Sequence, residues 1–217
     1  MTEAAHLTTT RESYDSIAAV YAERVVPPAE LDPVSRAMLA AFAELVRGAG
    51  GRPVADVGCG PGRVTAHLTA LGLSAFGVDL SPNMVRLASE AYPELRFREA
   101  SMDALDVPDN ALGGMLAWYS THHTPPELLP AVFAEFHRTL GPGGFLLWGD
   151  YTGDTHLRPT HAFGQPVSYE SYHLPLDRTI ELLRQAGFLV TTRVEQEPNE
   201  RVHRTHGCLL AHKADTF

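Results

Sequence analysis

Short apolar segments alternate with helix-like segments along most of this chain, and this alternation constrains the fold more than any other feature. Four segments have apolar residues at helical spacing and lie between the apolar runs: 62–72, 81–93, 125–141 and 176–188. Seven short apolar runs are typical of strands: 52–58, 74–80, 94–100, 113–120, 143–151, 188–196 and 206–213. Because crossovers between parallel strands are right-handed, the pattern predicts a mostly parallel seven-stranded sheet. The runs are apolar throughout, as in sheets covered by helices on both faces, so we expect a three-layer α/β sandwich.

The first 50 residues are expected to form helices. Segment 14–25 places one face of a helix on Tyr14, Ile17, Ala18, Tyr21 and Val25. A second helix is predicted within 32–51, with Asp32 as N-cap and Pro33 in its first turn. We therefore divide the chain into an N-terminal helical cap (1–50) and one compact core (51–217). Segment 151–174 has no clear period and is expected to be functional or to contain short strands.

Composition excludes several classes of partner. The chain of 217 residues carries 17 Lys and Arg against 26 Asp and Glu, a formal net charge of −9. A nucleic acid or an anionic membrane surface would be repelled, so neither is expected as a partner. Cys59 and Cys208 lie far apart, which fits a reduced, cytoplasmic protein without a disulfide framework. The histidines match no established metal-site spacing, so no metal is expected. Separately, the chain is expected to act as a monomer or homodimer.

The stretch "ADVGCGPGR" (55–63) places three glycines within five positions, directly after a predicted strand. A phosphate-binding loop would need Gly-Lys where the chain has Arg63-Val64. A dinucleotide loop would place its third glycine one position beyond Gly62. Asp79 ends the second strand, where a carboxylate can bind ribose hydroxyls. These features indicate an adenosine ligand and leave the rest of that ligand open.

Three motifs in order, "VADVGCGPGRVTAHL", "GVDLSPNMVRLA" and "LGPGGFLLWGD", resemble the class I S-adenosylmethionine-dependent methyltransferases, small-molecule branch, of the type 11/25 kind. The resemblance extends from about Tyr14 to Phe188. It implies a Rossmann-like sandwich with an antiparallel C-terminal strand and an N-terminal helical lid. It further implies S-adenosylmethionine as cofactor, a small-molecule methyl acceptor, and methyl transfer to an oxygen or a nitrogen.

The resemblance also implies which residues bind the cofactor. Asp79 would bind the ribose, Leu80 and Met84 would close the adenine side, and Asp56 would orient the ammonium group. The methionine tail would lie against the glycine loop, where Cys59 is a small spacer. The full expected set is Tyr14, Tyr21, Asp56, Gly58, Cys59, Gly60, Gly62, Asp79, Leu80, Met84, Ser101, Met102, Ala117 and Trp118.

The chain departs from the family after the third strand. The usual Gly-Asp-Ala is replaced by Ala100-Ser101-Met102, so the Asp that contacts adenine is missing. The Ser101 hydroxyl and the Met102 backbone are the expected substitutes. Asp103 lies nearby, but two positions out of register.

The stretch "AWYSTHH" (117–123) is expected to face the acceptor. His122 or His123 is the candidate general base, because imidazole titrates near neutral pH. The competing interpretation is that one of them only caps or packs at the strand end. The residues expected to contact the acceptor are Trp118, His122, Trp148, Tyr151 and Tyr172.

Two other functions are considered as alternatives to methyl transfer. The first is a catalytically silent protein that binds S-adenosylmethionine or S-adenosylhomocysteine. The second is a NAD-dependent oxidoreductase, which the early position of Gly62 and the lack of a Tyr-x-x-x-Lys-type pair disfavour.

Overall fold

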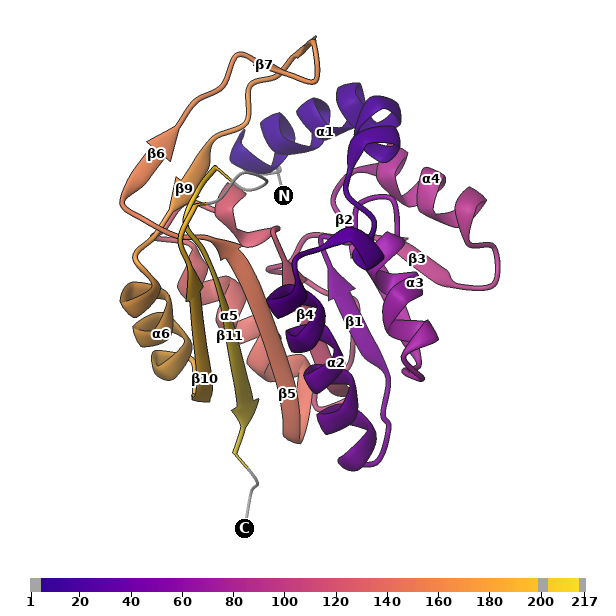
Figure 1. The fold of residues 1–217 in the computed structure, drawn as a ribbon, viewed down its shortest axis with the longest axis vertical. Helices are drawn as coiled ribbons and strands as arrows, with labels where there is room; N and C mark the ends of the chain where they lie inside the picture. Colours follow the sequence, from indigo (N-terminus) through magenta and orange to yellow (C-terminus); the bar gives the residue numbers. More distant parts are fainter. Residues whose placement is uncertain (1–4, 199–202, 215–217) are drawn as a thin grey trace.

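A computed structural model describes residues 5–198 and 203–214. The central sheet has seven strands in the order β10-β11-β5-β4-β1-β2-β3 (Figure 1). The strands are β1 (Val54–Val57), β2 (Ala75–Asp79), β3 (Arg96–Glu99), β4 (Leu112–Trp118), β5 (Leu140–Tyr151), β10 (Phe188–Gln196) and β11 (His206–Lys213). Strand β11 pairs antiparallel with both β5 and β10, and the pairs among β1 to β5 are parallel. The predicted mostly parallel sheet with an antiparallel C-terminal strand is confirmed.

The order of the strands reverses beside β1. Strands β2 and β3 follow on one side of β1, and β4 and β5 lie on the other. In open α/β sheets this switch point is where ligands bind, beyond the carboxyl ends of the strands. The carboxyl end of β1 is followed by the glycine loop, so the loop lies at the switch point.

Helices cover both faces of the sheet. They are α1 (Ala5–Arg24), α2 (Pro33–Gly48), α3 (Arg63–Ala70), α4 (Pro82–Ala91), α5 (Leu129–Thr139) and α6 (Leu176–Gln185), with short 3₁₀ turns η1 (Pro28–Glu30) and η2 (Thr121–His123). No helix in the described ranges has the length and apolar content needed to cross a bilayer.

Two hydrophobic cores separate the layers. Neighbouring residues of β4 point to opposite faces, as the two-residue period of a strand requires. Met115 is buried in the core that includes Phe133 of α5, whereas Leu116 is buried in the core that includes Phe42 of α2 and Leu68 of α3. The middle strands are therefore covered on both sides, which explains their continuous apolar character.

The predicted helix starts are confirmed at two positions. The Asp32 carboxylate accepts hydrogen bonds from the backbone N–H groups of Val34 and Ser35 at the start of α2. The Ser81 hydroxyl accepts one from Met84 N at the start of α4. In both helices a proline occupies the first turn, where a missing N–H costs nothing.

The first 50 residues serve two structural purposes. Helix α1 crosses the carboxyl edge of the sheet as a cover, which agrees with the expected lid (Figure 1). Helix α2 packs into the core of the sandwich through Phe42 and Val46, so it is part of a sheet layer and not of the cover. The division at residue 50 stays a prediction.

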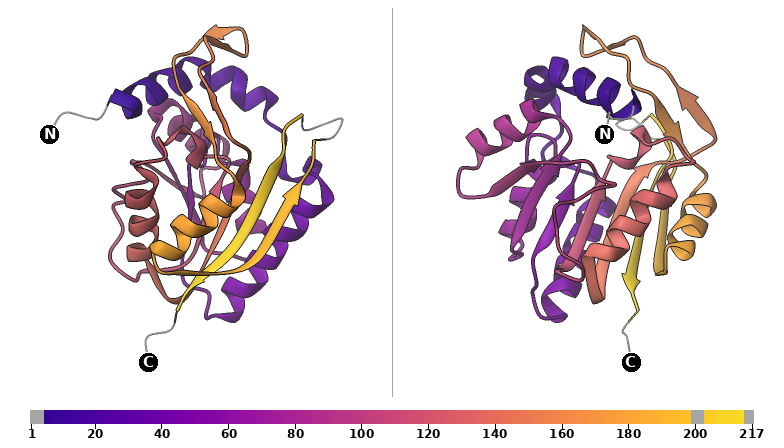
Figure 2. Two further views of the ribbon diagram at one scale, coloured as in Figure 1. Left: turned by 90° about the vertical axis from the view of Figure 1, so that its left-hand side faces the viewer. Right: turned by 180° about the vertical axis from the view of Figure 1, so that it is seen from behind.

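The segment after β5 contains four short strands. Strand β6 (Thr155–Leu157) pairs with β9 (Ser171–His173), and β7 (His161–Ala162) pairs with β8 (Gln165–Pro166). Two views of the ribbon show this insert rising beside α1 and over it (Figure 2). Ser168 N donates a hydrogen bond to the Ser13 hydroxyl on α1, so the insert and the helix form one cover.

Candidate functional site

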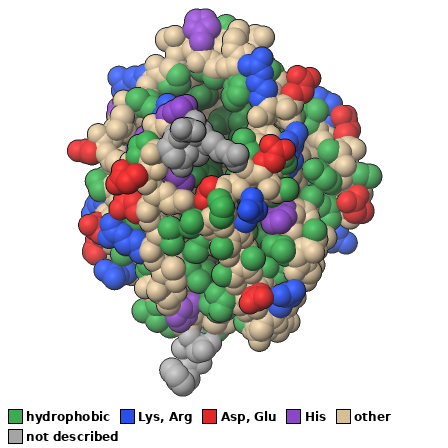
Figure 3. Space-filling model, in the orientation of Figure 1, with side chains coloured by type: hydrophobic (Ala, Val, Ile, Leu, Met, Phe, Trp, Pro, Cys, Tyr) green, Lys and Arg blue, Asp and Glu red, His purple; other side chains and the backbone are tan. Residues whose placement is uncertain are grey.

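A cavity of about 380 Å³ lies between the carboxyl edge of the sheet and α1. Its walls come from the ends of β1, β2 and β4, from the starts of α2 and α3, and from one face of α1. A hollow is visible in the upper part of the face shown in Figure 3. The volume is typical of a site for a small molecule.

The glycine loop forms one wall of the cavity with its backbone. Gly58 and Gly60 have φ of +78° and +52°, a conformation that favours glycine. A Cβ on Gly58 would lie 2.3 Å from Cβ of Ser120, so no side chain fits there. The N–H groups of Gly58 and Cys59 donate to the Val78 carbonyl, which fixes the loop against β2.

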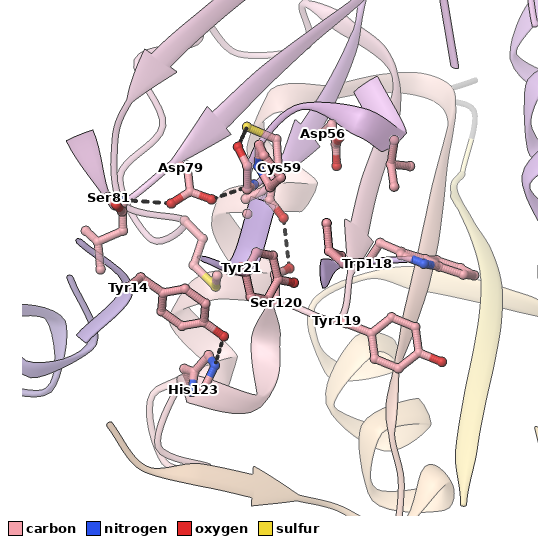
Figure 4. Close-up of a pocket in the computed structure, with 18 of the residues that line it drawn as sticks. Tyr14, Tyr21, Asp56, Cys59, Asp79, Ser81, Trp118, Tyr119, Ser120 and His123 are labelled. Atoms are coloured by element: carbon pink, nitrogen blue, oxygen red, sulfur yellow. Dashed lines mark hydrogen bonds between the residues drawn. The ribbon is translucent and has the colours of Figure 1, made fainter. Parts of the chain in front are cut away.

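Two carboxylates lie beside this loop, the buried Asp56 and the half-buried Asp79. The carboxylate of Asp79 accepts hydrogen bonds from Gly60 N at 2.8 Å and from Ser81 N at 2.9 Å (Figure 4). Asp56 accepts one from the Thr65 hydroxyl at 2.6 Å. Burial raises the pKa of Asp79 to about 6 and that of Asp56 to about 7. A cation bound between them would lower both pKa values, so this part of the cavity favours a positively charged ligand.

The segment after β3 lacks the acidic residue that the family has at this position. The Ser101 hydroxyl donates a hydrogen bond to the carboxylate of Asp103. Ala100, Ser101 and Met102 line the cavity. The departure in sequence therefore leaves a polar pair at the position where the family has a single Asp.

Tyr14 and His123 form a hydrogen-bonded pair in the cavity wall. The Tyr14 hydroxyl lies 2.7 Å from Nε2 of His123, and Nδ1 of the same ring lies 2.8 Å from the Glu170 carbonyl oxygen (Figure 4). Burial lowers the pKa of His123 well below its usual value, and the neighbouring His122 lowers it further. His123 is therefore a neutral imidazole near pH 7.

Three aromatic residues form a further part of the cavity lining. The rings of Trp118, Tyr119 and Tyr151 form an edge-to-face series, with centroids 5.6 Å and 5.0 Å apart. Tyr119 has φ of +52°, an unusual conformation for a residue with a side chain. All three residues line the cavity, which therefore offers aromatic as well as charged residues to a ligand.

Polar contacts hold α1 over the cavity. The Asp15 carboxylate accepts hydrogen bonds from the Ser81 hydroxyl at 2.5 Å and from Asn83 N at 3.2 Å. The Arg63 guanidinium donates to the carbonyls of Ala22 and Val25 at the end of α1. Sequence reasoning missed Asp15, and it treated Arg63 only as a mismatch of the glycine pattern.

The structure brings most of the residues expected from the sequence to the cavity wall. Those that line it are Tyr14, Tyr21, Asp56, Gly58, Cys59, Gly60, Asp79, Leu80, Ser101, Met102, Trp118, His123 and Tyr151. Their roles in binding remain predictions.

Six expected residues lie outside this lining, and packing explains three of them. A Cβ on Gly62 would lie 2.8 Å from the ring of Phe97, so this glycine permits α3 to pack and is not part of the cavity wall. Met84 and Ala117 are buried in the protein interior.

The other three have polar partners outside the cavity. Nδ1 of His122 donates to the buried carboxylate of Asp150 at 2.6 Å. Trp148 donates its ring N–H to the Thr121 hydroxyl, and the Tyr172 hydroxyl donates to the Glu170 carboxylate. The expectation that His122 contacts the acceptor is therefore not supported by its position, whereas His123 does line the cavity.

The cavity also includes residues that the sequence did not single out. The N-terminal half of α1 contributes Leu7 and Thr10, which share a helical face with Tyr14 and Tyr21. Extending the spacing rule toward the N-terminus would have found them. Tyr119 and Ser120 required knowledge of how the chain turns after β4. In the described ranges, no three His, Cys, Asp or Glu side chains gather as metal ligands.

The fold and this cavity define a class of protein first: a Rossmann-like α/β domain with a cavity at the switch point of its sheet. Residues 54–144 match the sequence model of a family described as methyltransferase domain. Residues 54–144 therefore belong to a methyltransferase domain family, in agreement with the resemblance to the class I S-adenosylmethionine-dependent methyltransferases.

Comparisons with individual proteins agree with this family. A trans-aconitate 2-methyltransferase of Shigella dysenteriae is 35% identical over 167 residues, which cover 68% of this chain and 62% of that protein. The structure of a 1,6-didemethyltoxoflavin-N1-methyltransferase of Burkholderia thailandensis has a TM-score of 0.68 at 21% identity, and the match covers 99% of this chain and 92% of that one. The [4+2]-cyclase SpnF has a TM-score of 0.72 at 18% identity, over 97% of each chain.

The chain spans between 29% and 62% of the length of the curated relatives that it matches. The solved structures, at 18% and 21% identity, show that the fold is shared. One of them is a cyclase, so the fold by itself does not specify methyl transfer.

Proposed function

We propose that this protein transfers a methyl group from S-adenosylmethionine to an oxygen or a nitrogen of a small molecule. The observation that carries the proposal is a cavity whose lining combines two carboxylates, Asp56 and Asp79, with the hydrogen-bonded pair Tyr14 and His123. The carboxylates fit a cationic donor, and the Tyr14–His123 pair fits an acceptor that loses a proton.

The residues around the two carboxylates fit the donor. Asp79 would accept hydrogen bonds from the ribose hydroxyls, and Leu80 and Met102 would pack on the adenine. The exposed backbone of Gly58 and Gly60 would lie against the methionine tail, because no Cβ blocks its approach. The Asp56 carboxylate would attract the ammonium group.

A bound donor supplies a methyl group attached to a positively charged sulfur, which is a good leaving group. The protein then contributes mainly proximity and orientation, which supply up to roughly 7–11 kcal/mol in favourable cases. The aromatic walls around Tyr119 and Tyr151 exclude water and orient an apolar or planar acceptor. A base is needed only where the acceptor atom carries a proton.

We further infer a cytoplasmic protein that works as a monomer or homodimer. Cys59 and Cys208 are free and buried, which fits a reducing compartment.

The test is a screen of small molecules with S-adenosylmethionine. The purified protein is incubated with matched hydroxyl, N–H and carboxylate compounds, and formation of S-adenosylhomocysteine and of methylated product is followed by mass spectrometry. The proposal predicts equal amounts of the two products with at least one hydroxyl or N–H compound. Tight binding of the donor with no transfer across a broad screen would favour the catalytically silent alternative.

A further inference from the structure

Tyr14 and His123 come from segments 109 positions apart and form a hydrogen bond of 2.7 Å inside the cavity. The second ring nitrogen, Nδ1, faces the Glu170 carbonyl oxygen at 2.8 Å. A carbonyl oxygen can only accept, so Nδ1 of the neutral ring carries the proton. Nε2 is then the acceptor, and the Tyr14 hydroxyl donates to it.

This direction leaves the oxygen of Tyr14 with lone pairs for a ligand. Tyr14 lines the cavity, so a proton-bearing group of a bound molecule can donate to it. The Tyr14 ring is held in place by stacking on Tyr169 at 5.6 Å and by edge contacts with Tyr21 at 6.0 Å and His123 at 5.2 Å. The hydroxyl is therefore a fixed acceptor and not a mobile one.

We propose that Tyr14 takes the proton of the methyl acceptor while it passes its own proton to Nε2 of His123, so that the acceptor atom is a hydroxyl oxygen or an N–H nitrogen. This inference rests on the proposed function. It assigns the contact with the acceptor to Tyr14, with His123 as the final proton carrier and the Glu170 carbonyl as the group that positions it. A carboxylate acceptor has no proton to lose and would not need this pair.

The step balances in atoms and charge. The methyl carbon forms a bond to the acceptor atom as its bond to sulfur breaks, the acceptor proton moves to the Tyr14 oxygen, and the Tyr14 proton moves to His123. The sulfur loses its positive charge while the imidazole gains one. The net charge of the cavity is unchanged, which permits a buried imidazole to accept the proton despite the cost of its burial.

The groups around His123 bear on its titration. His122 is the adjacent imidazole, with ring centroids 4.1 Å apart, and His173 on β9 also disfavours a charge on the ring. The Glu170 carbonyl favours it. The groups that face the ring are Tyr14 from α1, His122 from η2, Tyr169 and Glu170 from the insert, and His173 from β9.

The first test is the tautomer of His123, measured by long-range proton–nitrogen NMR on the protein labelled with ¹⁵N-histidine. The signals of this ring are assigned from their loss in His123→Asn. The expected result at neutral pH is a ring protonated on Nδ1 and unprotonated on Nε2. A ring protonated on Nε2, or on both nitrogens, would overturn the proposal, and neither result depends on any acceptor.

The second test is a pH titration of the same ring in two complexes. With S-adenosylhomocysteine bound the nearby positive charge is absent, so the imidazole should be protonated about tenfold more readily than with S-adenosylmethionine bound. Identical titration in the two complexes would contradict the relay. Failure of both ligands to bind would refute the proposed function instead. The tautomer of His123 would still show whether Tyr14 donates its hydrogen bond to Nε2.

Variants separate a proton relay from a merely structural contact. Tyr14→Phe should bind S-adenosylhomocysteine within about threefold of the unmodified protein, since the ring contacts remain, yet lose at least about a hundredfold in transfer rate. Tyr92→Phe removes a hydroxyl outside the cavity lining and serves as the matched control. An equal loss of binding and of rate in Tyr14→Phe would indicate a structural role and overturn the proposal. Likewise, identification of a carboxylate as the methylated group would overturn it.

Discussion

The Asp15 carboxylate on α1 accepts a hydrogen bond of 2.5 Å from the Ser81 hydroxyl, which itself caps α4. The backbone N–H of Ser81 donates in turn to Asp79, the carboxylate proposed to bind the ribose. The helix that covers the cavity is thus joined through one serine to the carboxylate beneath it. Movement of α1 and occupation of the cavity by the donor are expected to be coupled.

The contact at Asp15 can be tested by removing its carboxylate. Asp15→Ala should weaken donor binding about fivefold to a hundredfold, because a hydrogen bond to a charged group contributes about 1–3 kcal/mol. Amide hydrogen exchange in α1 should become faster. Glu12→Ala, which removes an exposed carboxylate from the same helix, should leave both measurements unchanged. Unchanged exchange in Asp15→Ala would show that the contact does not hold the cover.

Gly62 can be tested as a packing residue by comparing it with Gly164. Both have φ of +80°, but a Cβ on Gly62 would meet Phe97 at 2.8 Å, whereas a Cβ on Gly164 would have nothing within 4 Å. Alanine at either position bears the conformational cost of about 1 kcal/mol. Gly62→Ala should lose about 1–3 kcal/mol more in the free energy of unfolding, measured by urea denaturation. Equal losses in the two variants would mean that Phe97 moves aside freely.

The stability of the protein without a ligand should depend on pH through Asp79 and Asp56. Burial raises their pKa values to about 6 and about 7, above the ordinary value of 3.8. Between about pH 4 and 7 the folded protein therefore holds protons that the unfolded chain has released. The free energy of unfolding should fall as pH rises through this window, by on the order of 3 kcal/mol for Asp79 alone. Urea denaturation at several pH values measures this slope, and Asp79→Asn should reduce it.

Binding of the donor should release protons in the same window. A cation placed beside Asp56 and Asp79 favours their charged forms and lowers their pKa values. Calorimetric titration at pH 6.5 in phosphate and in Tris should therefore give different apparent binding enthalpies, because the two buffers take up protons with different heats. Asp56→Asn should shrink the difference. Equal enthalpies in both buffers would mean that the donor's charge does not lie near these carboxylates.

The local elements of the fold follow from the sequence because their causes are local. Asp32 and Ser81 cap helices through neighbours only two or three residues away, and each is followed by a proline. Strands covered on both faces show themselves as continuous apolar runs. The sequence therefore predicts the seven strands and the long helices. The four short strands of the insert have two or three residues each, which is too short for a periodic signal.

The sequence predicts only those site residues whose position depends on neighbouring residues in the chain. Gly58, Gly60 and Asp79 lie at strand ends, and the cavity is indeed located there. The bond between Tyr14 and His123, and that between Asp15 and Ser81, join segments that only the folded chain brings together. Gly62 shows the opposite case: it belongs to a ligand-binding pattern in the sequence, yet what it touches is Phe97. Packing partners at long range decide such roles, and spacing cannot reveal them.

The most direct test of the account is calorimetric titration of the protein with S-adenosylmethionine, S-adenosylhomocysteine and NAD in parallel. We expect saturable binding of the first two and none of NAD. We also expect loss of binding in Asp79→Ala but not in Asp106→Ala, which removes an exposed carboxylate. Binding of NAD alone, or an unchanged affinity for S-adenosylmethionine in Asp79→Ala, would contradict the assignment of this cavity to the methyl donor.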